Sequence, residues 1–218
     1  MKKRYDLIVF DWDGTVMDST AVIARSVQAA CRDLNLTVPS DEAARYVIGM
    51  GLNEALRHAV PDAPEALYKH LAAGYRYHFL SQDAQIPLFA GARETIVELH
   101  EQGYSLAVAT GKNRNGLNRA LASSGLGKYF HATRTADQTF SKPHPAMLLE
   151  LMDELSVSAE RMLMVGDTTH DLQMAINAGV DAVGFTHGAH PEEMLRELKP
   201  LALLGNFAKM RAWLKMHA

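Results

Sequence analysis

Short apolar runs recur along the chain, and most are separated by stretches in which apolar residues have helical spacing. The first run, at residues 7–10, is apolar at every position, as is typical of a strand buried on both faces of a sheet. Strands are expected at residues 7–10, 104–109, 130–135, 161–165, 180–185 and 201–204. Helices are expected at residues 93–101, 115–123, 145–155, 171–178 and 192–198, with a last one ending near residue 215. This alternation predicts an α/β fold, with a Rossmann-like parallel sheet covered by helices on both faces.

Residues 18–82 depart from this alternation, because they contain no convincing strand. Four helices are expected there, at residues 20–34, 41–48, 53–59 and 64–80, and their apolar residues recur at helical spacing. The sequence therefore predicts an α-helical cap domain at 18–82, inserted into an α/β core domain made of residues 1–17 and 83–218. Two short connections would join the insert to the core, which would permit hinge closure.

Composition narrows the class of protein. The 218 residues are 48% hydrophobic and 22% charged, as in ordinary soluble proteins, and the net charge of −3 offers no basic surface for nucleic acid. The single Cys31 excludes an internal disulfide and suits a reducing compartment. The apolar run after Met1-Lys2-Lys3-Arg4 is too short for a signal peptide, and no stretch approaches the roughly 20 apolar residues of a membrane span. We expect a cytoplasmic protein that is a monomer or a homodimer and binds neither nucleic acid nor membrane.

The first predicted strand ends in the sequence Asp11-Trp12-Asp13-Gly14-Thr15. A strand that stops there places two acids at the carboxyl edge of the sheet, where open α/β sheets bind their ligands. Two acids so close together repel each other, so a cation is the natural compensation. Both can face one small group only if the chain bends after Asp11, as Gly14 would permit. The alternative is that Asp11 and Asp13 are ordinary turn residues.

Three more groups of polar residues lie near the ends of predicted strands. They are Thr110-Gly111 after the second strand, Lys142-Pro143 before the helix that follows the third, and Gly166-Asp167 with Asp171 after the fourth. In a parallel sheet these groups can converge on Asp11. Each alone also fits a plain structural role: a turn, a solvated surface lysine, or a helix cap made by Thr168 and Asp171. Their joint occurrence, each at a strand end, favours a functional site.

With these four ordered motifs the chain resembles the haloacid dehalogenase superfamily of phosphatases and phosphotransferases. Asp11-Trp12-Asp13-Gly14-Thr15 matches the first family motif, Thr110 the second, Lys142 the third, and Gly166-Asp167 with Asp171 the fourth. The helical insert is similar to the small cap of phosphoglycolate phosphatase-like and β-phosphoglucomutase-like members. The dehalogenases lack the second acid of the first motif, so Asp13 favours phosphoryl transfer.

The resemblance implies a role for each motif residue. Asp11 would attack phosphorus and form an aspartyl-phosphate, and Asp13 would act as general acid and base. Thr110 and Gly111 would bind the phosphoryl oxygens, and Lys142 would neutralise their charge. A Mg²⁺ ion would be bound by Asp11, the backbone carbonyl of Asp13 and Asp167, with Asp171 in support. The Gly111-Lys112 pair after Thr110 varies among members and decides little.

Substrate choice is expected to lie with the cap loop at residues 45–52. Arg45 is a candidate to pair with an anionic substrate group, and Gly49 is a candidate to border the substrate. The alternative for Arg45 is a solvated helix arginine. His170, within the fourth motif, is expected to face solvent, and His187 and His190 to do no more than border the site.

These features favour an Mg²⁺-dependent phosphatase that acts on a small phosphorylated metabolite, with phosphoglycolate-like compounds as the favoured substrates. A phosphosugar mutase and an inorganic pyrophosphatase on the same scaffold stay open as alternatives. Two non-enzymatic alternatives are a phospho-accepting signalling receiver, which would lack the helical insert, and a binding protein on a decayed enzyme scaffold. The intact set of motif residues argues against the latter.

Overall fold

A six-stranded parallel sheet forms the centre of the computed structural model, which describes residues 3–217. The strand order is β3-β2-β1-β4-β5-β6, and all neighbouring strands are parallel. The strands are β1 (Leu7–Phe10), β2 (Ser105–Thr110), β3 (Ala132–Thr135), β4 (Met162–Gly166), β5 (Asp181–Phe185) and β6 (Ala202–Leu204). Phe10 lies opposite Val108 of β2 and Val165 of β4, so the three central strands end at about the same level. This register brings the first, second and fourth motifs to one edge, as the sequence predicts.

Helices cover both faces of the sheet and bury the alternating sides of each strand. One face is covered by α5 (Ala92–Glu101), α6 (Arg114–Ser124) and α10 (Phe207–His217), whose apolar residues form a cluster with Ile8 and Phe10 of β1. The other face is covered by α7 (Ala146–Leu155), α8 (Thr169–Ala178) and α9 (Glu192–Glu197), whose apolar residues form a second cluster with Leu7 and Val9. Burial on both faces explains why β1 is apolar at every position.

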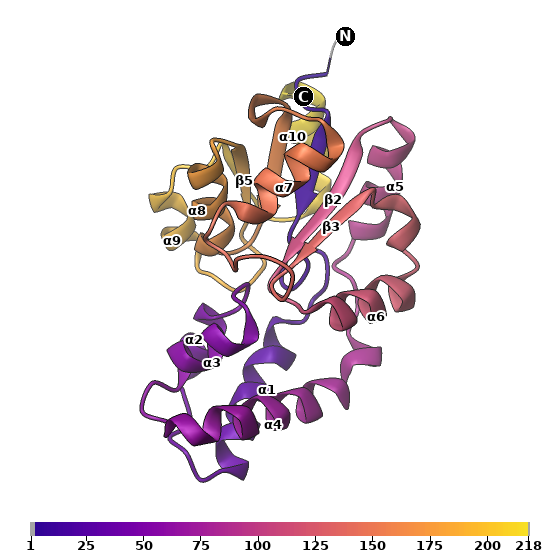
Figure 1. Cartoon of the computed structure of the whole chain (residues 1–218). Coiled ribbons are helices and arrows are strands. Elements are labelled where there is room, and N and C mark those ends of the chain that lie inside the picture. Colours follow the sequence, from indigo (N-terminus) through magenta and orange to yellow (C-terminus); the bar gives the residue numbers. More distant parts are fainter. Residues whose placement is uncertain (1–2, 218) are drawn as a thin grey trace.

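The insert consists of helices and has an apolar cluster of its own. Its α-helices are α1 (Thr20–Asp33), α2 (Asp41–Tyr46), α3 (Leu52–Ala59) and α4 (Tyr68–Leu80). Val27, Leu56 and Leu71 are buried together among them. In Figure 1 these four helices lie together at the end of the molecule opposite to the two chain termini. No residue from 18 to 82, all of which the structure describes, belongs to a strand, in agreement with the sequence.

The expected helices are found, with small shifts at their ends. The stretch from Pro64 begins with a 3₁₀ turn, η1 (Glu65–Leu67), before α4 starts at Tyr68. α2 ends at Tyr46 rather than residue 48, shortly before Gly49, whose φ of 95° is incompatible with a helix. The remaining 3₁₀ turns are η2 (Asp83–Gln85), η3 (Gly127–Tyr129) and η4 (Ala159–Arg161).

The two connections between the insert and the rest of the chain run side by side. Met17 and Leu88 form an antiparallel bridge, and the Asp18 amide donates to the Pro87 carbonyl at 3.0 Å. The Phe89 amide donates to the Val16 carbonyl at the same distance. Among the described residues, no helix is both long enough and apolar enough to cross a membrane.

Candidate active site

The loop after β1 turns sharply and carries Asp11, Asp13 and Thr15 to the carboxyl edge of the sheet. Gly14 adopts φ of 86°, and a Cβ at this position would lie 2.3 Å from Asp167 Oδ2, so only glycine fits. The Thr15 hydroxyl donates to Asp167 Oδ1 at 2.6 Å, which ties the loop to the end of β4. The bend that the sequence predicted at Gly14 therefore brings the first and fourth motifs into contact.

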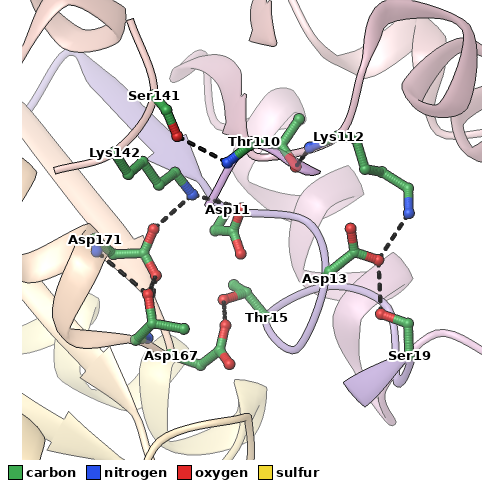
Figure 2. Close-up of polar contacts among 12 residues, drawn as sticks. Asp11, Asp13, Thr15, Ser19, Thr110, Lys112, Ser141, Lys142, Asp167 and Asp171 are labelled. Atoms are coloured by element: carbon green, nitrogen blue, oxygen red, sulfur yellow. Dashed lines mark hydrogen bonds and ion pairs between the residues drawn. The ribbon is translucent and has the colours of Figure 1, made fainter. Parts of the chain in front are cut away.

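Lys142 lies between two carboxylates and is almost completely buried, with 1% of its surface exposed. Its Nζ is 2.6 Å from Asp11 Oδ1 and 2.6 Å from Asp171 Oδ1 (Figure 2). Burial acts to lower the pKa of Lys142, but the attraction of the two carboxylates outweighs it, and the pKa is raised. The side chain is a charged ammonium, and the alternative of a solvated surface lysine is wrong.

Asp171 has two tasks at the start of α8. Its Oδ2 accepts the Thr168 amide at 3.0 Å and the Thr168 hydroxyl at 2.7 Å, and its own amide bonds the same hydroxyl. This is a capping box, as the alternative reading of the sequence expected. Because the other oxygen, Oδ1, binds Lys142, the helix cap also fixes a charged group of the site.

The carboxylates of Asp11, Asp167 and Asp171 form a buried acidic group in which the ligand oxygens lie within 4.8 Å of one another. Asp11 Oδ2 is buried and has no hydrogen-bond partner. Burial raises the pKa of Asp11 to about 7, against the opposing charge of Lys142, and burial likewise raises the pKa of Asp167. Three buried carboxylates with one ammonium leave negative charge uncompensated, and a hard divalent cation such as Mg²⁺ fits this set of oxygen ligands.

Thr110 and Gly111 lie at the end of β2 and line the cavity in front of Asp11. Thr110 is buried, and its hydroxyl accepts the Lys112 amide at 3.2 Å. Gly111 faces the cap loop, because a Cβ there would lie 2.4 Å from the Met50 carbonyl oxygen and 2.6 Å from that of Gly49. Glycine at this position permits close approach of the insert to the sheet edge.

A cavity of about 750 Å³ separates the sheet edge from the insert. The core lines it with Asp11, Asp13, Thr110 and Lys112, and the insert lines it with largely apolar residues. Those residues include Ile23, Val27, Ile48, Gly49, Tyr75 and Phe79. The acids of the first motif therefore lie in a hollow that the insert roofs.

The structure does not place Arg45 in this cavity. Its guanidinium donates to Asp41 Oδ2 at 2.7 Å and to the Thr20 hydroxyl at 3.2 Å. Both partners belong to the insert, and the ion pair with Asp41 is an ordinary pair one helical turn apart. These contacts agree with the alternative of a partly solvated helix arginine, and the pairing of Arg45 with a substrate group stays a prediction. Gly49 does border the cavity.

The insert is docked on the core through Tyr46. Its backbone carbonyl accepts from His170 Nε2 at 2.8 Å and from His190 Nε2 at 2.9 Å, and its ring stacks on that of His190. Next to it, the Gly51 amide donates to the Ser141 hydroxyl at 2.8 Å. His170 is only 5% exposed, so the expectation that it faces solvent is wrong. Its burial depends on contact between the insert and the core, which the local sequence pattern does not reveal.

Lys112, which was expected to decide little, contacts the second acid of the first motif. Its Nζ lies 2.9 Å from Asp13 Oδ1, and the Ser19 hydroxyl donates to the same oxygen at 2.7 Å (Figure 2). The ring of Phe79, from α4 of the insert, lies 4.6 Å from the ammonium. Its position in the sequence could have identified it as a site residue, because it lies two residues after Thr110, at the end of a strand already expected to contribute to the site.

A parallel sheet with these acids and lysines at its carboxyl edge, roofed by a helical insert after the first strand, defines the class of haloacid dehalogenase-type hydrolases. The sequence model of the family "Haloacid dehalogenase-like hydrolase" matches residues 8–185. The chain belongs to this family, which confirms the resemblance noted in its sequence.

Several proteins similar to this chain carry the name of a phosphatase. A probable phosphatase, IndB, of Dickeya dadantii is 36% identical over 210 residues, which cover 94% of this chain and 91% of the relative. A phosphoglycolate phosphatase of Aliivibrio fischeri is 31% identical over 220 residues, covering 96% of each chain. The crystal structure of a predicted phosphoglycolate phosphatase from Haemophilus somnus 129pt has a TM-score of 0.86 at 26% identity and covers 97% of this chain and 99% of that one. The protein is a phosphoric monoester hydrolase of this family.

Proposed function

We propose that this phosphatase hydrolyses a small phosphomonoester through an aspartyl-phosphate on Asp11, with phosphoglycolate-like compounds as the favoured substrates. The observation that carries the proposal is the state of the Asp11 carboxylate. One oxygen is fixed by Lys142 at 2.6 Å, and the other has no hydrogen-bond partner. A carboxylate held in one orientation with an unused oxygen is suited to attack phosphorus.

The chemistry runs in two displacements. In the first, an Asp11 oxygen forms a bond to phosphorus while the bond from phosphorus to the ester oxygen breaks, and Asp13 gives its proton to the departing oxygen. In the second, Asp13 takes a proton from a water molecule, whose oxygen attacks phosphorus and releases Asp11 and inorganic phosphate. Thr110 donates a hydrogen bond to the phosphoryl oxygens, and the Lys142 ammonium offsets their charge in both steps.

Mg²⁺ is the proposed cofactor. Asp11, Asp167 and the backbone carbonyl of Asp13 would hold it, and Asp171 would support this set through Lys142 or through water. The proximity of the three carboxylates and the unpartnered oxygen of Asp11 support this assignment. Bound there, the ion would offset charge on the phosphoryl group.

Residues 18–82 are proposed as a cap domain that opens and closes over a core made of residues 1–17 and 83–218. Two features support this division: the insert has an apolar cluster of its own, and its two connections lie side by side. Its contacts with the core, which include the polar contacts of Tyr46 and Gly51 and a small apolar cluster around Ile48 and Ala189, would form on closure. Closure would exclude bulk water from Asp11 during the first displacement.

A screen of the purified protein against phosphomonoesters and pyrophosphate, with and without Mg²⁺, tests the proposal. Phosphoglycolate should be hydrolysed with Mg²⁺ and not in the presence of a chelator, and Asp11→Asn should remove the activity. Turnover of pyrophosphate alone, or interconversion of sugar phosphates without release of inorganic phosphate, would reject the proposed reaction in favour of a pyrophosphatase or a mutase.

A further inference from the structure

The site holds two lysines with separate partners. Lys142 binds Asp11 and Asp171, whereas Lys112 binds Asp13, the proposed general acid and base. The side chains of Lys112 and Asp13 are each only 9% exposed, and both residues line the cavity. A nearly buried ammonium thus lies next to the group that must exchange a proton with the leaving oxygen.

The Lys112 ammonium needs an anionic partner in this nearly buried position, because an ammonium without a counter-charge is costly there. In the structure that partner is the Asp13 carboxylate, whereas Asp11 has Lys142 as its partner. In the first displacement Asp13 must contact the ester oxygen instead, so Lys112 then lacks a partner unless another anion enters the cavity.

The substrate itself can bring the missing anion. Asp13 donates to the ester oxygen across one hydrogen bond, so the Lys112 ammonium lies within roughly 6 Å of that oxygen. In an ester such as phosphoglycolate the carboxylate is attached to the ester carbon, so its oxygens lie about 3 Å from the ester oxygen by ordinary bond lengths. The remaining gap is the length of one hydrogen bond, so such a carboxylate can accept from Lys112.

The insert closes this position. The Phe79 ring lies 4.6 Å from the Lys112 ammonium, and Tyr75 stacks on Phe79 with ring centroids 5.9 Å apart. Both aromatic residues line the cavity and come from α4. In the docked insert the ammonium lies between the Asp13 carboxylate and an aromatic face, where water is displaced and ionic contacts are stronger than in solvent.

We propose that Lys112 is a specificity-determining residue that binds a negative charge on the leaving group, either a carboxylate or a second phosphate. When that anion binds, the ammonium exchanges the Asp13 carboxylate for the substrate anion, and Asp13 can then contact the ester oxygen. The inference rests on the proposed phosphatase function and adds to it the substrate class: phosphomonoesters with an anionic leaving group.

The test compares phosphoglycolate with 2-hydroxyethyl phosphate, which replaces the carboxylate by a neutral hydroxymethyl group. The readout is the ratio of kcat/KM for the two esters. Lys112→Met should lower this ratio by about 30-fold, mostly through KM for phosphoglycolate, as expected when a charge-assisted hydrogen bond is lost. Lys112→Arg should retain part of the preference. Lys128→Met, which removes an equal charge from an exposed site outside the cavity, should leave the ratio unchanged.

A ratio that Lys112→Met does not change would overturn the inference, whether both rates fall together or neither falls. The wild-type enzyme provides a second measurement that does not depend on the variant folding. It should prefer phosphoglycolate, or an ester with a second phosphate, over 2-hydroxyethyl phosphate by about 10-fold or more. Hydrolysis of all three at equal efficiency would reject the role of Lys112 and leave the phosphatase proposal intact, whereas hydrolysis of none would reject the phosphatase proposal itself.

Discussion

The Lys142 ammonium lies 2.6 Å from Asp11 Oδ1, although 131 positions separate the two residues in the chain. The parallel sheet makes this contact possible, because β1 and the loop that follows β3 deliver their polar residues to the same edge. The same ammonium binds Asp171, the capping residue of α8. One side chain thus joins three of the four motifs, and the geometry of Asp11 depends on it.

Removal of the Lys142 charge should affect both stability and turnover. Lys142→Met would leave the buried Asp11 and Asp171 carboxylates facing each other, so the free energy of unfolding at pH 8 should fall by about 3 kcal/mol or more. Denaturant titration measures this. Turnover should fall on every phosphate ester, because Lys142 acts on the phosphoryl group that all of them share. Lys128→Met serves as the control for charge, and Asp171→Asn combined with Lys142→Met should restore part of the stability.

Asp167 should matter for the metal more than for the fold. Asp167→Asn is expected to raise the Mg²⁺ concentration needed for half-maximal rate, since such sites depend on one or two carboxylates. Without metal the variant should be as stable as the wild type or more so, because burial raises the pKa of Asp167 and its ionised form is unfavourable there. Rates measured over a Mg²⁺ series, with denaturant titration in chelator, test both parts. An unchanged Mg²⁺ dependence would remove Asp167 from the metal site.

Gly111 should control the docking of the insert. In Gly111→Ala the new Cβ would meet the carbonyl oxygens of Met50 and Gly49 at 2.4 and 2.6 Å, so the cap loop must move away. We expect kcat/KM to fall about 10-fold or more, a cost typical of overpacking, with the core still folded. Gly127→Ala is a matched control, because its Cβ would meet Leu121 at an ordinary 3.5 Å. Equal activity of the two variants would show that close approach at Gly111 is dispensable.

His190 should make stability depend on pH. Burial lowers its pKa from 6.5 to about 4, against the hydrogen bond to the Tyr46 carbonyl. The Thr169 amide donates to Nδ1, so the neutral ring donates from Nε2. The unfolded chain takes up a proton near pH 6.5 and the folded chain only near pH 4, so stability is full above pH 6.5 and is lost as pH falls through this window.

The lost stability amounts to roughly 3 kcal/mol for this group. Comparison with His190→Gln isolates the contribution of His190 to the pH dependence of stability, because the glutamine amide can donate to the Tyr46 carbonyl without titrating. Between pH 7 and pH 4.5 the free energy of unfolding should fall more for the wild type than for the variant. A constant difference over that range would mean that His190 is solvated and does not couple docking to pH.

Much of the fold follows from local patterns in the sequence. β1 and β4 are apolar at nearly every position because helices cover both faces of the sheet, and this made them recognisable as buried parallel strands. The convergence of Asp11, Thr110, Lys142 and Asp167 was also predictable, because the carboxyl ends of parallel strands share an edge.

The contacts between insert and core could not be predicted in the same way. Whether Arg45 points into the cavity or pairs with Asp41, and whether His170 is solvated or buried under Tyr46, depends on how two remote segments dock. The role of Lys112 depends likewise on Ser19 and Phe79, which belong to the insert and its border. Helical spacing and turn chemistry carry no information on such tertiary contacts.

The most direct test of the mechanism is to trap the phosphoryl group on Asp11. Enzyme mixed with phosphoglycolate and Mg²⁺ is quenched in acid within one turnover, digested, and examined by mass spectrometry. We predict that the peptide containing Asp11 gains the mass of one phosphoryl group, that the modification maps to Asp11 rather than Asp13, and that Asp11→Asn shows none. Turnover of phosphoglycolate without this modification, or with equal modification in the Asp11→Asn variant, would contradict the account.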